Sequence, residues 1–75
     1  MNKKQFGNII KDRRKKLAIT QRELASLANI GINTLTKIER GEANPSFSVI
    51  ANIIDTLGLE MDLKIKINNN LVNKP

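Results

Sequence analysis

The 75-residue chain lacks cysteine, histidine, tyrosine and tryptophan, and its only aromatic residues are Phe6 and Phe47. Without cysteine the chain has neither a disulfide framework nor a thiolate zinc site, and the missing histidine removes the usual zinc and proton-shuttle chemistries. So few aromatic rings argue against modules that stack splayed bases. Because clustered carboxylates and a phosphate-binding glycine loop are also missing, we expect a protein without enzymatic activity, cofactor or metal.

Long apolar runs are missing as well. No stretch approaches the roughly 20 apolar residues that span a bilayer. No apolar run follows Lys3 and Lys4 to make a secretory signal. We therefore expect no membrane association and a cytoplasmic location. A chain of this size makes one domain that buries only about 60% of its unfolded surface, so a second subunit is a plausible supplement to its core.

Positive charge is what the chain has in excess. Thirteen Lys and Arg residues against seven Asp and Glu give a net charge of +6. A basic balance in so small a domain favours a polyanionic partner, of which nucleic acid is the commonest. Because a basic balance also serves solubility, charge alone does not decide between these two interpretations.

Apolar residues recur at helical spacing in four segments, which predicts helices at about residues 4–17, 20–28, 31–40 and 46–57. Thr20 and Glu23 have the spacing of a capping box, and Ser46 is placed to cap the last helix. We expect Asn29 and Gly41 in the left-handed conformation, where each ends a helix. The apolar sides of the helices consist of Phe6, Ile9, Ile10, Leu17, Leu24, Ala25, Leu27, Ala28, Leu35, Ile38, Phe47, Val49, Ile50, Ile53, Ile54 and Leu57.

The period of the pattern changes after Gly58. Residues 59–67 alternate strictly between apolar and charged, which predicts a half-buried β-strand. Three asparagines follow, and we expect residues 68–75 to form a flexible tail. The apolar side of the strand consists of Met61, Leu63, Ile65 and Ile67.

This predicted strand has no partner strand within the chain. Unpaired, it would leave its backbone groups and its apolar side exposed. Antiparallel pairing with a second copy across a two-fold axis removes both problems, so we predict a homodimer joined by residues 59–67. Two alternatives remain, namely pairing with a neighbouring domain and a disordered segment.

The two short central helices have the proportions of a DNA-reading pair. Ala25 is small enough for close approach, and the second helix can then project its first half into a groove about 12 Å wide. Its outward residues carry no carboxylate, whereas ordinary solvated helix faces usually contain glutamate. A solvated face is the alternative interpretation. The outward residues are Ile32, Asn33, Thr34, Thr36 and Lys37.

From Phe6 to Leu59 the chain resembles the Cro and phage-repressor (XRE) family of helix-turn-helix proteins. The resemblance rests on Phe6-Gly7, Thr20-Gln21, Glu23-Leu24-Ala25, Ile38-Glu39-Arg40-Gly41 and Asn44-Pro45-Ser46. It implies a mainly α fold, with a four-helix lambda-repressor-like DNA-binding domain at residues 1–58 and the dimerisation strand at 59–67.

The resemblance also implies roles for individual residues. The expected base contacts are Ile32, Asn33, Thr36 and Lys37, and the expected phosphate contacts are Gln21, Thr34, Thr20 and Asn44. Arg14 and Glu39 match a mostly buried structural ion pair between the first and third helices. The sequence departs from the family at Ile32, where a polar reader is common, and at Gly31, which replaces a capping Ser or Thr.

Four helices followed directly by a strand, with the pattern Leu-Gly-Leu-Glu-Met-Asp-Leu at residues 57–63 and a similar overall length, also resemble the HipB-type antitoxins. That resemblance implies a homodimer that represses its own operon at a palindromic double-stranded operator and binds a HipA-like kinase toxin. The alternatives are a stand-alone XRE-family regulator without a toxin and an interaction module whose DNA binding is vestigial.

Overall fold

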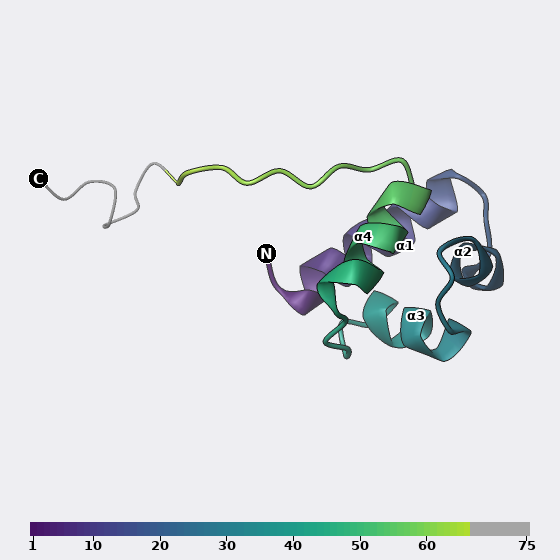
Figure 1. Ribbon diagram of the computed structural model, residues 1–75. Coiled ribbons are helices and arrows are strands. Elements are labelled where there is room, and N and C mark those ends of the chain that lie inside the picture. Colours follow the sequence, from purple (N-terminus) through teal and green to yellow (C-terminus); the bar gives the residue numbers. More distant parts are fainter. Residues whose placement is uncertain (67–75) are drawn as a thin grey trace, which may run out of the picture.

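Four helices make up most of the described chain, and Figure 1 shows their arrangement. The computed structural model describes residues 1–66, so Ile67 and the tail predicted at 68–75 lie outside the described residues. The helices are α1 (Lys3–Lys16), α2 (Gln21–Leu27), α3 (Ile32–Glu39) and α4 (Phe47–Thr56). The predicted mainly α fold is confirmed, and every predicted helix end lies within one residue of the observed one. Within residues 1–66, no helix is long and apolar enough to cross a membrane.

Side-chain caps determine where three of the helices begin. Thr20 and Glu23 form the predicted capping box at α2, each side chain accepting from the other's backbone N–H. The Ser46 hydroxyl accepts the predicted capping bond at α4, at 3.3 Å. Asn2 and Gln5 form a second capping box at α1 that the sequence analysis did not anticipate. Such a cap satisfies N–H groups that the helix leaves unpaired and stabilises it by about 1 kcal/mol.

Left-handed residues close the turns after the helices. Asn29 (φ 56°) and Gly41 (φ 77°) adopt the predicted conformation. Ala18 (φ 58°) also adopts the left-handed conformation, directly after α1. The sequence does not indicate this turn, because the residue is neither glycine nor asparagine. Such a backbone costs an L-residue about 1–2 kcal/mol, so it needs support from its surroundings. The Ile19 N–H donates to the Arg14 carbonyl across this turn, at 3.3 Å.

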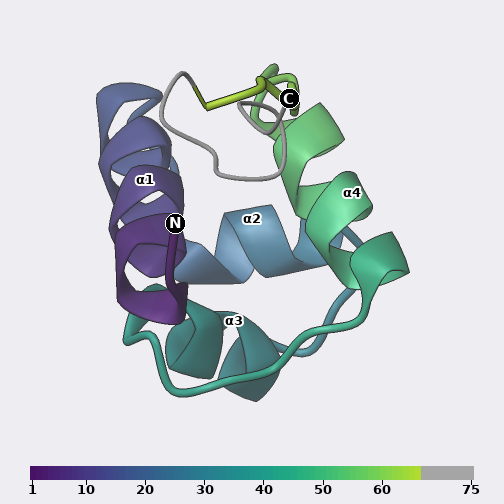
Figure 2. The ribbon, with the colours of Figure 1, turned by 90° about the vertical axis from the view of Figure 1, so that its left-hand side faces the viewer.

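The core lies between the helices and consists of aliphatic side chains. Helix α3 packs against α1 and α2, while α4 packs against α2, so the helices enclose a common centre (Figure 2). The sequence prediction was wrong for Leu27 and Phe47, which are exposed, because α2 buries only a narrow stripe and Phe47 lies in the first turn of α4. Ile9 and Leu17 are exposed as well. The core cluster comprises Ile10, Leu24, Ala25, Ala28, Leu35, Ile38, Ile53 and Leu57.

Helices α1 and α3 approach each other most closely at Gly7. A Cβ atom at this buried position would lie 2.9 Å from the carbonyl oxygen of Glu39 and closer still to that of Ile38. A glycine inside a helix costs about 0.5–1 kcal/mol relative to alanine, so its presence here has a packing reason. The missing side chain lets the end of α3 lie directly against α1.

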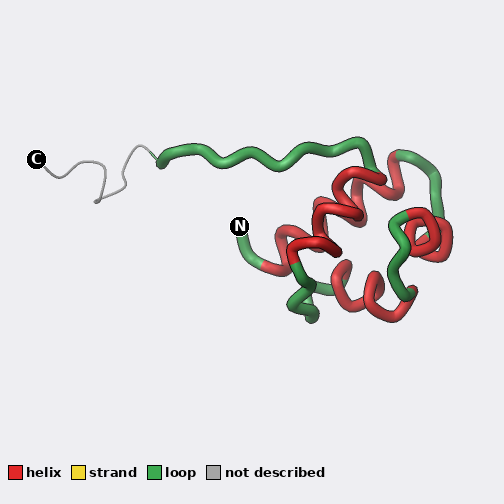
Figure 3. Tube along the Cα trace, viewed as in Figure 1, coloured by secondary structure: helices red, strands yellow, loops and turns green. Residues whose placement is uncertain are grey.

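Beyond α4 the chain continues without regular structure. Residues 59–66 run on as an extended segment, and no strand occurs within residues 1–66 (Figure 3). A strand that pairs across a dimer requires both copies, so the predicted strand at 59–67 and its pairing stay predictions. Within this segment Met61, Leu63 and Ile65 are exposed, whereas Leu59 packs against the core.

Candidate nucleic-acid interface

Helices α2 and α3 form a pair of short helices joined by a tight turn. Ala28 ends α2, the left-handed Asn29 reverses the chain, and Gly31 begins α3 without a side-chain cap. The Ile30 N–H donates to the Ala25 carbonyl at 2.9 Å, which fixes the turn against α2. Figures 1 and 2 both show α3 at the edge of the helical cluster, with one side turned away from the other helices.

The outward side of α3 carries the predicted base contacts. Asn33 and Lys37 are exposed and lie one helical turn apart, on the same side of the helix. Ile32 and Thr36 are half-buried. Ile32 packs partly against the core, and the Thr36 hydroxyl donates to the Ile32 carbonyl at 2.9 Å. Asn33 and Lys37 are therefore the most accessible of the four side chains to a ligand.

The predicted phosphate contacts come from three parts of the chain. Thr34 is exposed in the first turn of α3, and Asn44 is exposed in the loop between α3 and α4. Thr20 is exposed at the start of α2, where its hydroxyl accepts the capping bond from Glu23 at 3.0 Å. A hydroxyl that accepts one bond can still donate another, so capping does not prevent Thr20 from binding an anion.

Arg14 and Glu39 are brought together as an ion pair between α1 and α3. The Arg14 Nε donates to Glu39 Oε2 at 2.7 Å, and Nη2 donates to Oε1 at 3.0 Å. Nη1 donates to the Ile19 carbonyl at 3.0 Å. Only 11% of the Arg14 side chain and 3% of the Glu39 side chain are exposed. The pair thus joins α1, the turn before α2 and the end of α3.

Gln21 and Thr36 extend this pair toward the outward side of α3. The Gln21 Nε2 donates to Glu39 Oε1 at 3.0 Å, and its Oε1 lies 3.2 Å from the Thr36 hydroxyl, whose single hydrogen it shares with the Ile32 carbonyl. Gln21 therefore ties α2 to α3, a role that the sequence analysis missed because no spacing in the sequence signals it. An amide nitrogen carries two hydrogens, so the bond to Glu39 leaves one for a phosphate.

The surroundings of Glu39 keep its side chain ionised. Burial by itself would raise the pKa of the carboxyl. The hydrogen bonds from Arg14 and Gln21, together with the positive charges of Arg14 and Lys11, outweigh burial and lower that pKa below its usual value. The hydrogen bond to Glu39 is also the main reason that the pKa of Arg14 is raised. No buried side-chain polar atom within residues 1–66 lacks a hydrogen-bond partner, which is consistent with a fully formed network.

Comparison with known proteins places this arrangement in a family. A model of the helix-turn-helix family matches residues 10–64, which include α2, α3 and α4. The chain belongs to the helix-turn-helix family, in its Cro and phage-repressor (XRE) branch. No curated protein matches the chain.

Solved structures share both the fold and about a quarter of the sequence. The restriction-modification controller protein C.AhdI from Aeromonas hydrophila is 26% identical, with a TM-score of 0.73 over 76% of this chain and 86% of that one. A chain of the HipA-HipB-O2-O3 complex is 28% identical, with a TM-score of 0.77 over 87% and 92%. The clp gene regulator ClgR from C. glutamicum is 26% identical, with a TM-score of 0.71 over 77% and 75%. These similarities confirm the lambda-repressor-like fold.

The contribution of Glu39 to stability should depend on pH. We expect Glu39→Gln to lower the free energy of unfolding by about 3 kcal/mol at neutral pH, because it strands the Arg14 charge. The folded-state pKa of Glu39 is lowered, so its stabilising effect is complete above the unfolded pKa of about 4.3 and is lost as the pH falls through the folded value. Urea titrations of both proteins from pH 7 to pH 3 should therefore show the difference shrinking upon acidification.

Glu42→Gln is the matched control. Glu42 lies 3.9 Å from Arg40 in an exposed pair, so its loss should change the unfolding free energy by less than about 0.5 kcal/mol. Equal effects of the two substitutions, or a difference for Glu39 that grows on acidification, would contradict the assigned role.

Proposed function

We propose that this protein is a sequence-specific DNA-binding transcriptional repressor that inserts α3 into the major groove. The observation that carries the proposal is the outward side of α3, which is accessible, free of carboxylates and held in place by the Arg14–Glu39–Gln21–Thr36 network. An acidic residue on that side would repel phosphate, whereas amide, hydroxyl and ammonium groups suit base edges and phosphates.

Each predicted contact has a chemical counterpart on DNA. Asn33 can bind adenine through two hydrogen bonds, and Lys37 can donate to guanine O6 and N7 or to a phosphate. Ile32 suits the methyl group of thymine, and Thr36 lies beside it on the same side of α3. The phosphate contacts that fix the register of the protein on the duplex are then Gln21, Thr34, Thr20 and Asn44.

Two of the structural neighbours support a regulatory role. C.AhdI is a restriction-modification controller protein, and ClgR is a clp gene regulator. Both share the four-helix fold with this chain across most of their length. The excess of positive charge in this chain, +6, adds the attraction for the DNA backbone that such a role requires.

A homodimer joined by residues 59–67 is the second part of the proposal. Leu63 is 98% exposed in the single chain and Ile65 is 77% exposed, so the segment presents apolar side chains that a second copy would cover. A two-fold dimer presents two copies of α3 to half-sites about one helical turn apart, which fits a palindromic operator.

The HipA-HipB-O2-O3 complex favours a more specific role, that of an antitoxin. The similarity covers 87% of this chain, which is more than residues 1–58 make up. We infer that this protein represses its own operon and binds a HipA-like kinase toxin. Purification of the chain with the product of an adjacent kinase-like gene should give a stable complex. Failure of that product to bind, or the absence of such a gene, would favour a stand-alone regulator.

Sequence specificity is the property to measure first. An operator selected from a random DNA pool should bind at least about 10³-fold more tightly than scrambled DNA at physiological salt. Asn33→Ala and Lys37→Ala should each lower that ratio about tenfold or more, because they remove contacts to bases. Gln21→Ala should instead weaken binding to both DNAs.

Lys16→Ala is the matched control, since it removes the same charge as Lys37→Ala from the far end of α1. We expect it to leave the specificity ratio unchanged. A ratio near one for the wild-type protein would contradict the repressor and favour an interaction module with vestigial DNA binding.

The dimer has its own test. Truncation after Gly58 removes the predicted strand but leaves all four helices, so sedimentation equilibrium should show monomers that keep the helical circular dichroism of the full chain. Dimers of unchanged strength after truncation would show that residues 59–67 do not join the subunits.

A further inference from the structure

The segment after α4 carries its charges in an ordered way. Glu60 and Asp62 come first, Lys64 and Lys66 follow, and an apolar residue stands between each charge and the next. All seven residues from 60 to 66 are exposed, and the segment is extended (Figure 1). In an extended chain alternate side chains point to opposite sides, so the four charges share one side and Met61, Leu63 and Ile65 share the other.

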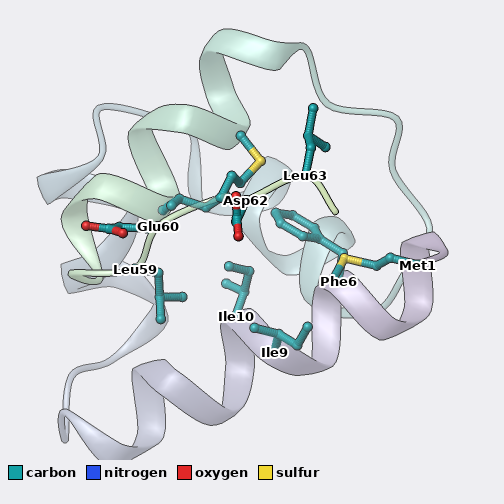
Figure 4. Close-up of a pocket in the computed structure, with 10 residues that line it drawn as sticks. Met1, Phe6, Ile9, Ile10, Leu59, Glu60, Asp62 and Leu63 are labelled. Carbon is teal, nitrogen blue, oxygen red and sulfur yellow. The ribbon is translucent and has the colours of Figure 1, made fainter. Parts of the chain in front are cut away.

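The segment begins at a mostly apolar groove between α1 and α4, whose lining also includes Glu60 and Asp62. Figure 4 shows Phe6, Ile9 and Ile10 of α1 on one wall, with the segment from Leu59 to Leu63 opposite. Met1 and Ile54 complete the apolar lining. Ile9 is exposed in the single chain, so the groove is incompletely filled. A ribbon of two such segments would cover the groove with its apolar side and present its charges to water.

The order of the charges makes the segment complementary to itself. In antiparallel pairing about a two-fold axis, residues equally far from the axis but on opposite sides of it face each other. If Leu63 lies on the axis, Glu60 faces Lys66 of the other copy, and Asp62 faces Lys64. Met61 then faces Ile65 on the apolar side. Symmetry repeats every pair, so each of the four charges in each copy has an opposite charge across from it.

Other registers lose this match. With the axis at Asp62 or at Lys64, that residue faces its own copy, which places like charges together. With the axis at Met61, Glu60 faces Asp62 of the other copy. With the axis at Ile65, Lys64 faces Lys66 of the other copy. An axis between two residues sets charged side chains against apolar ones. Parallel pairing in register sets every charge against its own copy.

We propose that residues 60–66 are a self-complementary strand that pairs antiparallel with a second copy of this chain, with Leu63 on the two-fold axis. The paired segments of the two copies then cover the apolar groove between α1 and α4. The inference rests on the proposed homodimer and its antiparallel strand pairing, and it adds the register, which the order of the charges selects. Because like charges directly opposite each other destabilise a strand pair, the same charge order also disfavours the competing arrangements.

Charge reversal tests the register. Glu60→Lys and Lys66→Glu should each weaken the dimer about tenfold at low salt, because each places like charges together twice per dimer. The double variant Glu60→Lys with Lys66→Glu restores both pairs and should dimerise within about twofold of the wild type. Sedimentation equilibrium of the four full-length proteins measures these constants. At 1 M salt, where the screening length is about 3 Å, the differences should largely disappear.

The double variant separates the registers. With the axis at Asp62, Glu60 faces Lys64, so the double variant would be as weak as Glu60→Lys. With the axis at Lys64, Asp62 faces Lys66, so it would be as weak as Lys66→Glu. A double variant that fails to recover therefore overturns the register, while monomers after truncation at Gly58 would still support the strand-joined dimer. Dimers that survive that truncation overturn both.

Cysteine cross-linking gives a second measurement, since the chain has no cysteine of its own. Only a residue on the axis lies opposite its own copy. Leu63→Cys should therefore form a disulfide-linked dimer fastest under mild oxidation, with Asp62→Cys and Lys64→Cys as matched controls. Faster cross-linking of either control would move the axis to that residue and contradict the proposal.

Discussion

The bidentate bond between Arg14 and Glu39 is the contact on which the rest of this small domain depends. It joins the first helix to the end of the third, and the same carboxylate accepts a bond from Gln21 at the start of the second. Such a pair is costly to bury and costly to break, so its value lies in position rather than in net stability. It fixes the angle at which α3 is held, and through Gln21 it reaches Thr36 on the outward side of that helix.

The close contact at Gly7 makes this geometry possible. Only a residue without a side chain lets the carbonyl groups at the end of α3 lie against α1. Neither α2 nor α3 has much scope for adjustment, because both helices are short and the core between them is filled by Leu24, Leu35 and Ile38. Structural rigidity of this kind suits a helix that must match the fixed spacing of base edges.

The helices and their ends were predictable from the sequence because they depend on local spacing. The capping box of Thr20 and Glu23 marks the start of α2, and Ser46 marks the start of α4. Asn29 and Gly41 mark the places where the chain reverses direction. The exposure of Leu27 and Phe47 was not predictable, since apolar character does not say which side of a short helix finds neighbours.

At the candidate site the ion pair was predictable from the sequence, but the other contacts around it were not. The resemblance to the XRE family named both Arg14 and Glu39, whose meeting depends on how α1 crosses α3. Gln21 contacts both Glu39 and Thr36 only because the fold brings α1, α2 and α3 together. The spacing of residues along the sequence does not reveal that contact. The alternation after Gly58 predicts a strand, whereas the proposed register rests on the order of the charges, which hydrophobic patterning leaves out.

The central claim is that two copies of α3, joined through the segment after α4, read DNA on one face of the duplex. Hydroxyl-radical footprinting of the full-length protein on a selected operator tests it most directly. The account predicts two protected patches centred about one helical turn apart, roughly 34 Å, on the same face of the duplex. A single protected patch, or protection spread evenly along the DNA, would contradict it.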